Sequence, residues 1–190
     1  MTKQFDITAE YVRSILDYNP QTGVFVWRPR APDDFKDKGG KYTKERSCKI
    51  FNKRFAGKQA GVSLNKRIDP YSKININNRQ YLAHVIAWFY VTGDFPKVDI
   101  DHKDNNPLNN SFQNLRLSSR TENNANAKKR LDNTTGFKGV CFNKNAKKFS
   151  SKIQFERKQI NLGYFNSAEE AYKAYCEAAK KLFGEFARFE

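Results

Sequence analysis

Asp101 and His102 are adjacent, and seven asparagines follow them before Ala125. Carboxylate and amide oxygens are hard ligands that suit Mg²⁺ or Mn²⁺ and leave coordination positions for a phosphate and water. An imidazole, with an ordinary pKa of about 6.5, can act as a general base near neutral pH. Hydrolysis of a phosphodiester needs one group to stabilise developing charge and another to deprotonate the attacking water. These side chains therefore favour metal-assisted phosphodiester hydrolysis.

The surrounding sequence predicts the elements that bring these groups together. Residues 98–102 favour a short extended segment, and residues 105–110 favour a loop, because Asn and Asp side chains bond nearby backbone groups. Residues 114–117 lead back as a second extended segment. A capping box at residues 119–122 then begins a helix, with Asn123 in its first turns. We expect a strand, loop, strand and helix that hold an acid, an imidazole and amides together.

The same residues resemble the motif of the HNH (ββα-metal) endonucleases, in particular those of phage homing endonucleases. The segment LAHVIAWFYVTGDFPKVDIDHKDNN, residues 82–106, is similar to the core of that family. The resemblance implies that Asp101 and Asn123 ligate the metal and that His102 is the general base. It also implies that Asn114 holds the loop and the imidazole.

Other roles are open to some of these polar residues. Asp99 and Asp101 could begin a calcium loop, but the EF-hand pattern requires a Gly and a Glu that are missing at the corresponding positions. Asn124 is the alternative metal ligand if the register of the helix differs by one residue. The remaining side chains are expected to be structural: solvated turns at Asn105, Asn106, Asn109 and Asn110, loop or strand-end acids at Asp99 and Asp104, and a core position at His84. The alternative for His84 is that it backs the active site.

The C-terminal part of the chain predicts a small sheet followed by a helix. Residues 137–142, 149–155 and 159–162 alternate apolar and polar residues as strands do, and a capping box at 167–170 begins the helix. This segment, from Thr135 to about Phe189, resembles an AP2/ERF DNA-binding domain on its GV, LGYF and SAEEAYKAY stretches. The resemblance implies an antiparallel sheet whose outer face enters the major groove of DNA.

The alternation assigns the two faces of this sheet. The apolar parity is expected to face the helix and contains Val140, Phe142, Ile153, Phe155, Ile160 and Leu162. The other parity carries Lys, Gln and Asn, which suit phosphates, guanine and adenine edges. Plant AP2 members use Arg and Trp at many of these positions, so their target sequence does not transfer. The predicted DNA contacts are Lys138, Asn143, Lys144, Lys152, Gln154, Gln159 and Asn161.

The charge of the chain also predicts a nucleic-acid partner. The formal net charge is +15, of which +7 falls on residues 36–58 and +8 on residues 128–158. Residues 29–58 are expected to form a basic loop that is disordered without a partner and adds phosphate contacts. No stretch is suited to cross a bilayer or lie on one, so no membrane partner is expected. The three cysteines form no CxxC pair, which disfavours a structural zinc site and fits a reducing compartment.

Further elements are expected in the first half of the chain. Residues 7–18 predict an amphipathic helix, and residues 24–27 a strand. Residues 71–76 predict another short strand, stopped by the sequence at 77–79. The apolar run at residues 82–90 predicts a buried helix in which the aromatic side chains belong to the core.

The sequence therefore predicts an α+β protein. It would consist of an N-terminal HNH ββα-metal nuclease module and a C-terminal AP2-like three-stranded antiparallel sheet packed on one helix. The expected divisions are a helix, strand and basic loop at 1–60, the nuclease module at 61–127, a linker at 128–134 and the DNA-binding domain at 135–190.

The predicted function is that of a phage homing-type DNA endonuclease that uses Mg²⁺ or Mn²⁺. Its expected partner is double-stranded DNA, and its expected place of action is the host cytoplasm. The alternative is a non-catalytic DNA-binding regulator with a degenerate HNH fold. One active site per chain predicts a nick from a monomer or a double-strand break from a dimer, and the sequence leaves both open.

Overall fold

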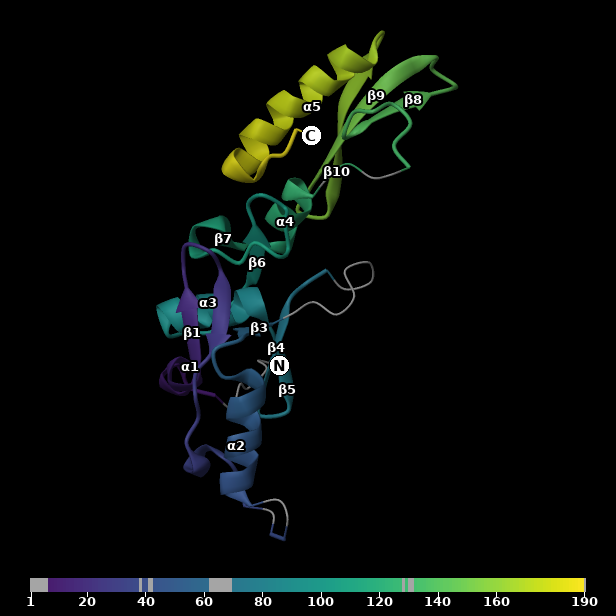
Figure 1. The fold of residues 1–190 in the computed structure, drawn as a ribbon. Coiled ribbons are helices and arrows are strands. Elements are labelled where there is room, and N and C mark those ends of the chain that lie inside the picture. The colour runs from purple at the N-terminus through teal and green to yellow at the C-terminus, as the bar shows by residue number, and fades with distance from the viewer. Residues whose placement is uncertain are drawn as a thin grey trace. The chain divides into compact units, whose positions relative to one another are not determined.

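A computed structural model describes residues 7–37, 39–40, 43–61, 70–127, 129 and 132–189 of the chain. Contacts between residues divide the chain into two compact units, which we call unit 1 (Met1–Arg116) and unit 2 (Leu117–Glu190). Both units contain helices and antiparallel sheets, as expected for an α+β protein (Figure 1).

Unit 1 begins with a helix that is shorter than predicted. Helix α1 spans Ala9–Ile15, and strand β1 (Leu16–Asn19) follows directly, so the predicted helix over residues 7–18 is wrong after Ile15. From Leu16 the chain is extended, so that alternate residues of β1 enter the core and the strand pairs with its neighbour. Strand β2 (Val24–Trp27) agrees with the prediction. Together with β3 (Gln59–Ala60) they form a sheet in the order β1–β2–β3.

The basic segment 29–58 contains a helix, which corrects the prediction of a loop. After a 3-10 turn, η1 (Pro32–Asp34), helix α2 spans Lys44–Phe55, and its N-cap Thr43 accepts a bond from the Arg46 amide. Its inner face carries Cys48 and Phe51 and its outer face most of the charges, so the helix is amphipathic. The density of Lys and Arg hid this pattern in the sequence.

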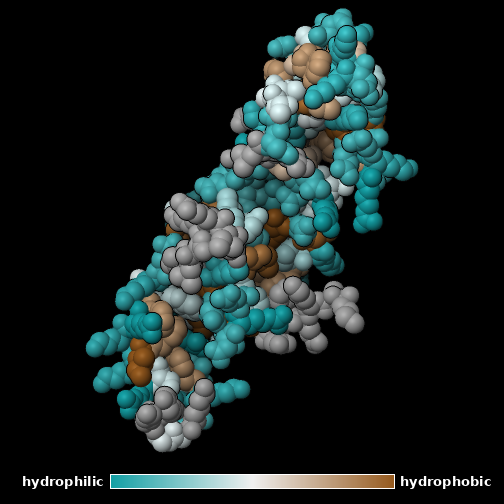
Figure 2. All heavy atoms as spheres, turned by 90° about the vertical axis from the view of Figure 1, so that its right-hand side faces the viewer, coloured by the Kyte–Doolittle hydropathy of each residue, from teal (hydrophilic) through white to brown (hydrophobic). Residues whose placement is uncertain are grey.

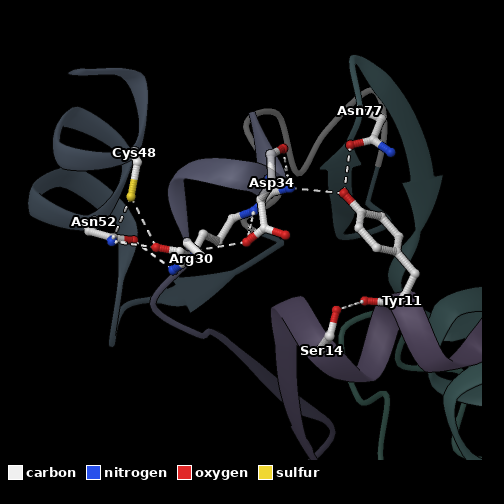
Figure 3. A network of polar contacts seen from close by, with 8 residues as sticks. Tyr11, Ser14, Arg30, Asp34, Cys48, Asn52 and Asn77 are labelled. Atoms are coloured by element: carbon white, nitrogen blue, oxygen red, sulfur yellow. Dashed lines mark hydrogen bonds and ion pairs between the residues drawn. The ribbon is translucent and has the colours of Figure 1, made fainter. Parts of the chain in front are cut away.

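The inner face of α2 is fixed by Arg30 (Figure 3). The Cys48 thiol and the Asn52 amide donate to the Arg30 carbonyl at 3.0 and 2.9 Å. The guanidinium lies over the Phe35 and Phe51 rings, 4.8 and 5.3 Å from their centroids. These contacts give the helix a folded partner within the chain, because an isolated helix of this length would be marginal in water.

A hairpin and a buried helix complete the core of unit 1. Strands β4 (Lys73–Ile76) and β5 (Arg79–Leu82) are joined by Asn77 and Asn78, which both have positive φ, as a tight hairpin turn requires. The predicted strand therefore ends where expected, but Arg79 begins a new strand. Helix α3 (Ala83–Thr92) confirms the predicted buried helix and ends at Gly93.

The elements expected for the nuclease motif follow in the predicted order. Strand β6 spans Asp99–His102 and pairs with β7 (Leu115–Ser118), after a 3-10 turn, η2 (Phe112–Asn114). Helix α4 spans Arg120–Asn126 and begins with the predicted capping box. The division between the units runs through β7, so α4 belongs to unit 2.

Unit 2 contains the predicted three-stranded sheet and helix. Strands β8 (Val140–Asn143), β9 (Lys148–Phe155) and β10 (Lys158–Phe165) are antiparallel in the order β10–β9–β8. Helix α5 (Ala168–Phe183) packs on them and is followed by η3 (Gly184–Phe186). The side chain of Glu170 accepts from the Asn166 amide, not from the Ser167 amide that a full capping box would use.

The burial of the sheet agrees with the predicted parity only in part. Val140 and Ile153 are buried, and Phe155 and Leu162 pack at the border of the core. Phe142 and Ile160 were expected to be inside, but they are exposed. Both lie on edge strands, β8 and β10, whereas α5 covers the central strand β9 most closely.

The surface is largely hydrophilic where Figure 2 shows it, with separate hydrophobic patches. Among the described residues, no helix combines the length and the apolar character needed to cross a membrane.

Candidate active site

Asp101 and His102 lie at the end of β6 and are both buried, with 5% of each residue exposed. The Asp101 carboxylate is paired with Arg116 of the neighbouring strand β7. The guanidinium donates from Nε and Nη2 to the same oxygen, Oδ2, at 2.9 and 2.8 Å. Because a buried carboxylate needs a charged partner, this pair holds the Asp101 side chain in one position.

Asn114 bonds to the loop after β6, whereas the resemblance implied that it holds both this loop and the imidazole. Its Oδ1 accepts from the Asp104 amide at 3.1 Å. Its Nδ2 donates to the Asp104 carboxylate at 2.9 Å and to the Asn109 carbonyl at 2.8 Å. Burial raises the pKa of the Asp104 carboxyl, but bonds from the Asn106 amide and from the Asn109 and Asn114 side chains outweigh it and keep this pKa below its ordinary value.

The side chain that meets the imidazole is Asn110. Its Oδ1 lies 3.2 Å from His102 Nε2, and the residue is only 4% exposed. The prediction that Asn110 is a solvated turn residue is therefore wrong. Nothing in the asparagine-rich loop distinguishes this residue from its neighbours, because its burial depends on residues near the N-terminus. The burial of Asn110 could have been predicted only by knowing which distant segment of the chain packs on this loop.

Two further aromatic rings border His102. The His84 ring lies 5.0 Å from the His102 ring, centroid to centroid, and the Tyr71 ring lies 6.1 Å from it. Burial, with a smaller contribution from the charge of His102, lowers the pKa of His84 to about 4. His84 is therefore a buried neutral side chain at neutral pH, as expected of a core position, and it also forms part of the wall of the site.

Asn123 lies on α4 in unit 2 and is half-buried, whereas Asn124 is exposed. The core of unit 2 holds this helix through Ala125, which clusters with Tyr175 and Phe183. Lys138 also caps it, because Nζ donates to the carbonyls of Ala125 and Ala127 at 2.5 and 2.7 Å. The helix that carries a predicted metal ligand is therefore folded as part of the C-terminal unit.

The predicted metal ligands are a carboxylate and an amide. Among the described residues there is no cluster of three or more His, Cys, Asp or Glu side chains suited to a metal ion. The hard oxygens of Asp101 and Asn123 fit Mg²⁺ or Mn²⁺, which accept few protein ligands and keep several waters. The pairing of Asp101 with Arg116 fixes the carboxylate but also offsets its charge.

The predicted DNA contacts of unit 2 fall into two groups. Lys144, Gln154, Gln159 and Asn161 are exposed, and Asn143 and Lys152 are half-buried. Three of the seven have bonds within the protein: Lys138 caps α4, Asn143 accepts from the amides of the β8–β9 turn, and Asn161 accepts from the Gly163 amide. Burial, and to a lesser degree the charge of Arg188, lowers the pKa of Lys138 to about 8. Its ammonium group is already bonded to two carbonyls of α4, so this lysine is poorly placed for a phosphate contact.

Comparisons with known proteins find the two predicted domains. An HNH endonuclease family model matches residues 81–125, which include all four nuclease motif positions. An AP2 domain model matches residues 135–185, which include all seven predicted DNA contacts. Protein 3.8 of Escherichia phage T7 is 36% identical over 107 residues, which cover 56% of this chain and 88% of the phage protein. No solved structure gives a significant match. The chain therefore belongs to the family of T7 Protein 3.8 and combines an HNH endonuclease domain with an AP2 domain.

Proposed function

We propose that this protein is a metal-dependent DNA endonuclease of the phage homing type, directed to its target by the AP2 domain. The observation that carries the proposal is the buried pair Asp101–His102, whose imidazole is held by Asn110 within the segment that matches the HNH family. The domain limits 61–127 and 135–190, joined by a linker at 128–134, stay a prediction.

The orientation of His102 suggests which nitrogen acts. If Nε2–H donates to Asn110 Oδ1, the lone pair of the neutral ring is on Nδ1. Nδ1 would take a proton from water as its oxygen bonds to phosphorus and the bond to the leaving sugar oxygen breaks. Asp101 and Asn123 would hold a divalent cation, which when bound stabilises negative charge on the phosphate. Asn114 would keep the loop in place, and Arg116 would orient the carboxylate.

DNA would be bound by both units. In unit 2 the exposed Lys144, Gln154 and Gln159 suit phosphates and base edges. In unit 1 the outer face of α2 presents Arg46 and Lys49, and Lys53 one turn further on. Contacts of these cations with phosphates would make the affinity fall steeply with salt.

The test is cleavage of supercoiled plasmids that carry fragments of the source genome, with Mg²⁺, with Mn²⁺ and with EDTA. We expect nicked or linear DNA only with metal, and loss of both products in His102→Ala and Asn123→Ala while DNA binding is retained. A linear product formed from each plasmid without a nicked intermediate would indicate two sites acting together, and sedimentation would then show a dimer.

One observation favours a second candidate, a DNA-binding regulator without catalysis. The Arg116 guanidinium offsets the charge of Asp101 and would weaken a cation bound there. If the wild-type protein binds DNA but never cuts it with either metal, the endonuclease proposal fails and this candidate replaces it. Action in the host cytoplasm is part of the same proposal and rests on the relationship to a phage protein.

A further inference from the structure

Asn110 is held in one orientation inside unit 1. Its Oδ1 faces His102 Nε2 at 3.2 Å, while its Nδ2 donates to the Leu108 carbonyl at 3.4 Å. The second bond identifies which end of the amide is oxygen, because only the NH₂ group can donate to a carbonyl. The oxygen therefore faces the imidazole, and the ring must donate its Nε2 proton to it.

The N-terminal hairpin β1–β2 fixes the backbone of this asparagine. The Tyr18 hydroxyl on β1 donates to the Asn110 carbonyl at 2.7 Å, in a buried position. The Phe112 amide donates to the Pro20 carbonyl in the hairpin turn at 2.8 Å. The Tyr18 ring is itself fixed, since it stacks on Phe25 of β2 at 4.5 Å between centroids. Two bonds, at the Asn110 carbonyl and at the Phe112 amide, thus tie the loop to the hairpin.

Gly23, at the end of the hairpin turn, lets the backbone of this turn contact the backbone of the loop at Asn110. Its φ is +73°, a conformation that favours glycine. A Cβ atom at this position would lie 2.3 Å from the carbonyl carbon of Asn110 and 2.3 Å from the amide nitrogen of Ser111. No side chain fits there, so the hairpin turn is in direct contact with the loop that carries Asn110.

We propose that Asn110 is a positioning residue for His102 and that the β1–β2 hairpin is the part of the molecule that holds it in place. The hairpin spans residues 16–27, outside the HNH match at 81–125. Its role would be to fix the Nε2–H form of the imidazole and direct Nδ1 at the water. The catalytic role of Asn110 rests on the proposed nuclease function, whereas its effect on the orientation of the His102 ring does not depend on that function.

The experiment compares four variants of the full chain: Asn110→Ala, Asn110→Asp, Tyr18→Phe and the control Tyr11→Phe. Three quantities are measured for each: the single-turnover cleavage rate, the Kd for the same DNA and the ¹⁵N NMR signals of the imidazole nitrogens at a pH where the ring is neutral. The chain has two histidines, so a spectrum of His102→Ala assigns the signals.

Asn110→Ala should lower the cleavage rate about 10- to 100-fold, as loss of a partner that orients a functional imidazole commonly does, with Kd unchanged. It should also abolish the preference for the Nε2–H form. Asn110→Asp keeps an oxygen acceptor and should keep that preference and most of the rate. Tyr18→Phe should lower the rate about three- to tenfold, because it removes one hydrogen bond from the support.

Tyr11→Phe removes a hydroxyl of the same unit that bonds to Asn77 and Arg30, and should leave the cleavage rate unchanged. The proposal is overturned if Asn110→Ala retains both the wild-type rate and the wild-type ¹⁵N pattern. It is also overturned if Tyr11→Phe slows cleavage as much as Tyr18→Phe. If the wild-type protein does not cut DNA, the nuclease function fails, while the ¹⁵N pattern still decides whether Asn110 orients the ring.

Discussion

The two parts of the nuclease motif are held by different units. Asp101, His102 and Asn114 lie in unit 1, where Arg116, Asn110 and the loop backbone bond to them directly. Asn123 lies on a helix of seven residues that unit 2 holds through Ala125 and Lys138. The motif is continuous in the sequence and in the family match, but the packing divides it.

This difference indicates what each unit contributes. A seven-residue helix cannot be stable alone, so the position of Asn123 depends on the core of unit 2. If Asn123 ligates the metal, as proposed, the stability of unit 2 would also affect cleavage. Both tryptophans, Trp27 and Trp88, lie in unit 1, so their fluorescence reports the unfolding of that unit. Far-UV ellipticity reports the helices of both units, so a loss of ellipticity without a change in tryptophan fluorescence indicates the unfolding of unit 2.

The largest effect is expected from Arg116→Met. This change leaves the buried Asp101 carboxylate without its guanidinium partner and should lower the free energy of unfolding of unit 1 by about 3–5 kcal/mol. Urea unfolding followed by tryptophan fluorescence measures it. The control Arg28→Met breaks an exposed pair with Asp17 and should cost less than about 1 kcal/mol. Equal losses in the two variants would contradict the view that Asp101 is a buried, paired charge.

Gly139→Ala should have a comparable but smaller effect, on unit 2. The new Cβ would lie 2.2 Å from Tyr175 Cδ2, at a φ of +76°. Overpacking and backbone strain together should lower the free energy of unfolding of unit 2 by about 2–4 kcal/mol. The control Gly136→Ala has a φ of +78° with no atom within 4 Å of the new Cβ, so only the strain remains. Denaturation followed by far-UV circular dichroism should separate the two variants, and a change in tryptophan fluorescence would show that unit 1 is also affected.

Acid should destabilise unit 1 through His84. Its folded pKa of about 4 lies below the unfolded value, so the unfolded state binds the proton first. The contribution of neutral His84 to the free energy of unfolding is complete above about pH 6.5. It is lost as the pH falls towards 4, and the total loss is roughly 3 kcal/mol. Unfolding of wild type and His84→Gln, measured across this range, should show a flatter pH dependence in the variant. If the free energy of unfolding depends on pH equally in both proteins, His84 is not the cause of the acid destabilisation.

The smallest effect is expected from Lys138→Met. Loss of the two bonds to the carbonyls of α4 should lower the stability of unit 2 by about 1–2 kcal/mol. If unit 2 positions Asn123, DNA cleavage should slow while binding changes little. Lys173→Met, on the exposed face of α5, is the matched control. Cleavage at the wild-type rate in a measurably destabilised Lys138→Met protein would break the link between the AP2 domain and the nuclease site.

Several elements were predictable because their signals are local. The capping box at Ser119 and Glu122 specifies where α4 begins, since both bonds form within one turn. The apolar run at residues 82–90 predicted a buried helix, and α3 confirms it from Ala83 onward. The strands of the AP2 domain were predictable from alternation, but the exposure of Phe142 and Ile160 was not, since it depends on how far α5 reaches over the edge strands.

The sequence by itself determined which two domains this protein combines and which residues are the candidates for its chemistry. Asp101, His102, Asn114 and Asn123 are specified by residue type and spacing, and both domain matches follow the same stretches. These motifs can be identified without a structure because they depend on residue types and on bonds between close neighbours along the chain.

Only the tertiary structure decided which groups support that chemistry. Asn110 differs from the other loop asparagines because Tyr18 and Gly23, about 90 residues earlier, enclose its backbone. Lys138 caps α4, more than ten residues earlier in the chain, and Arg30 meets the inner face of α2. These roles depend on contacts between distant parts of the chain, which hydrophobic periodicity and local hydrogen bonding do not encode.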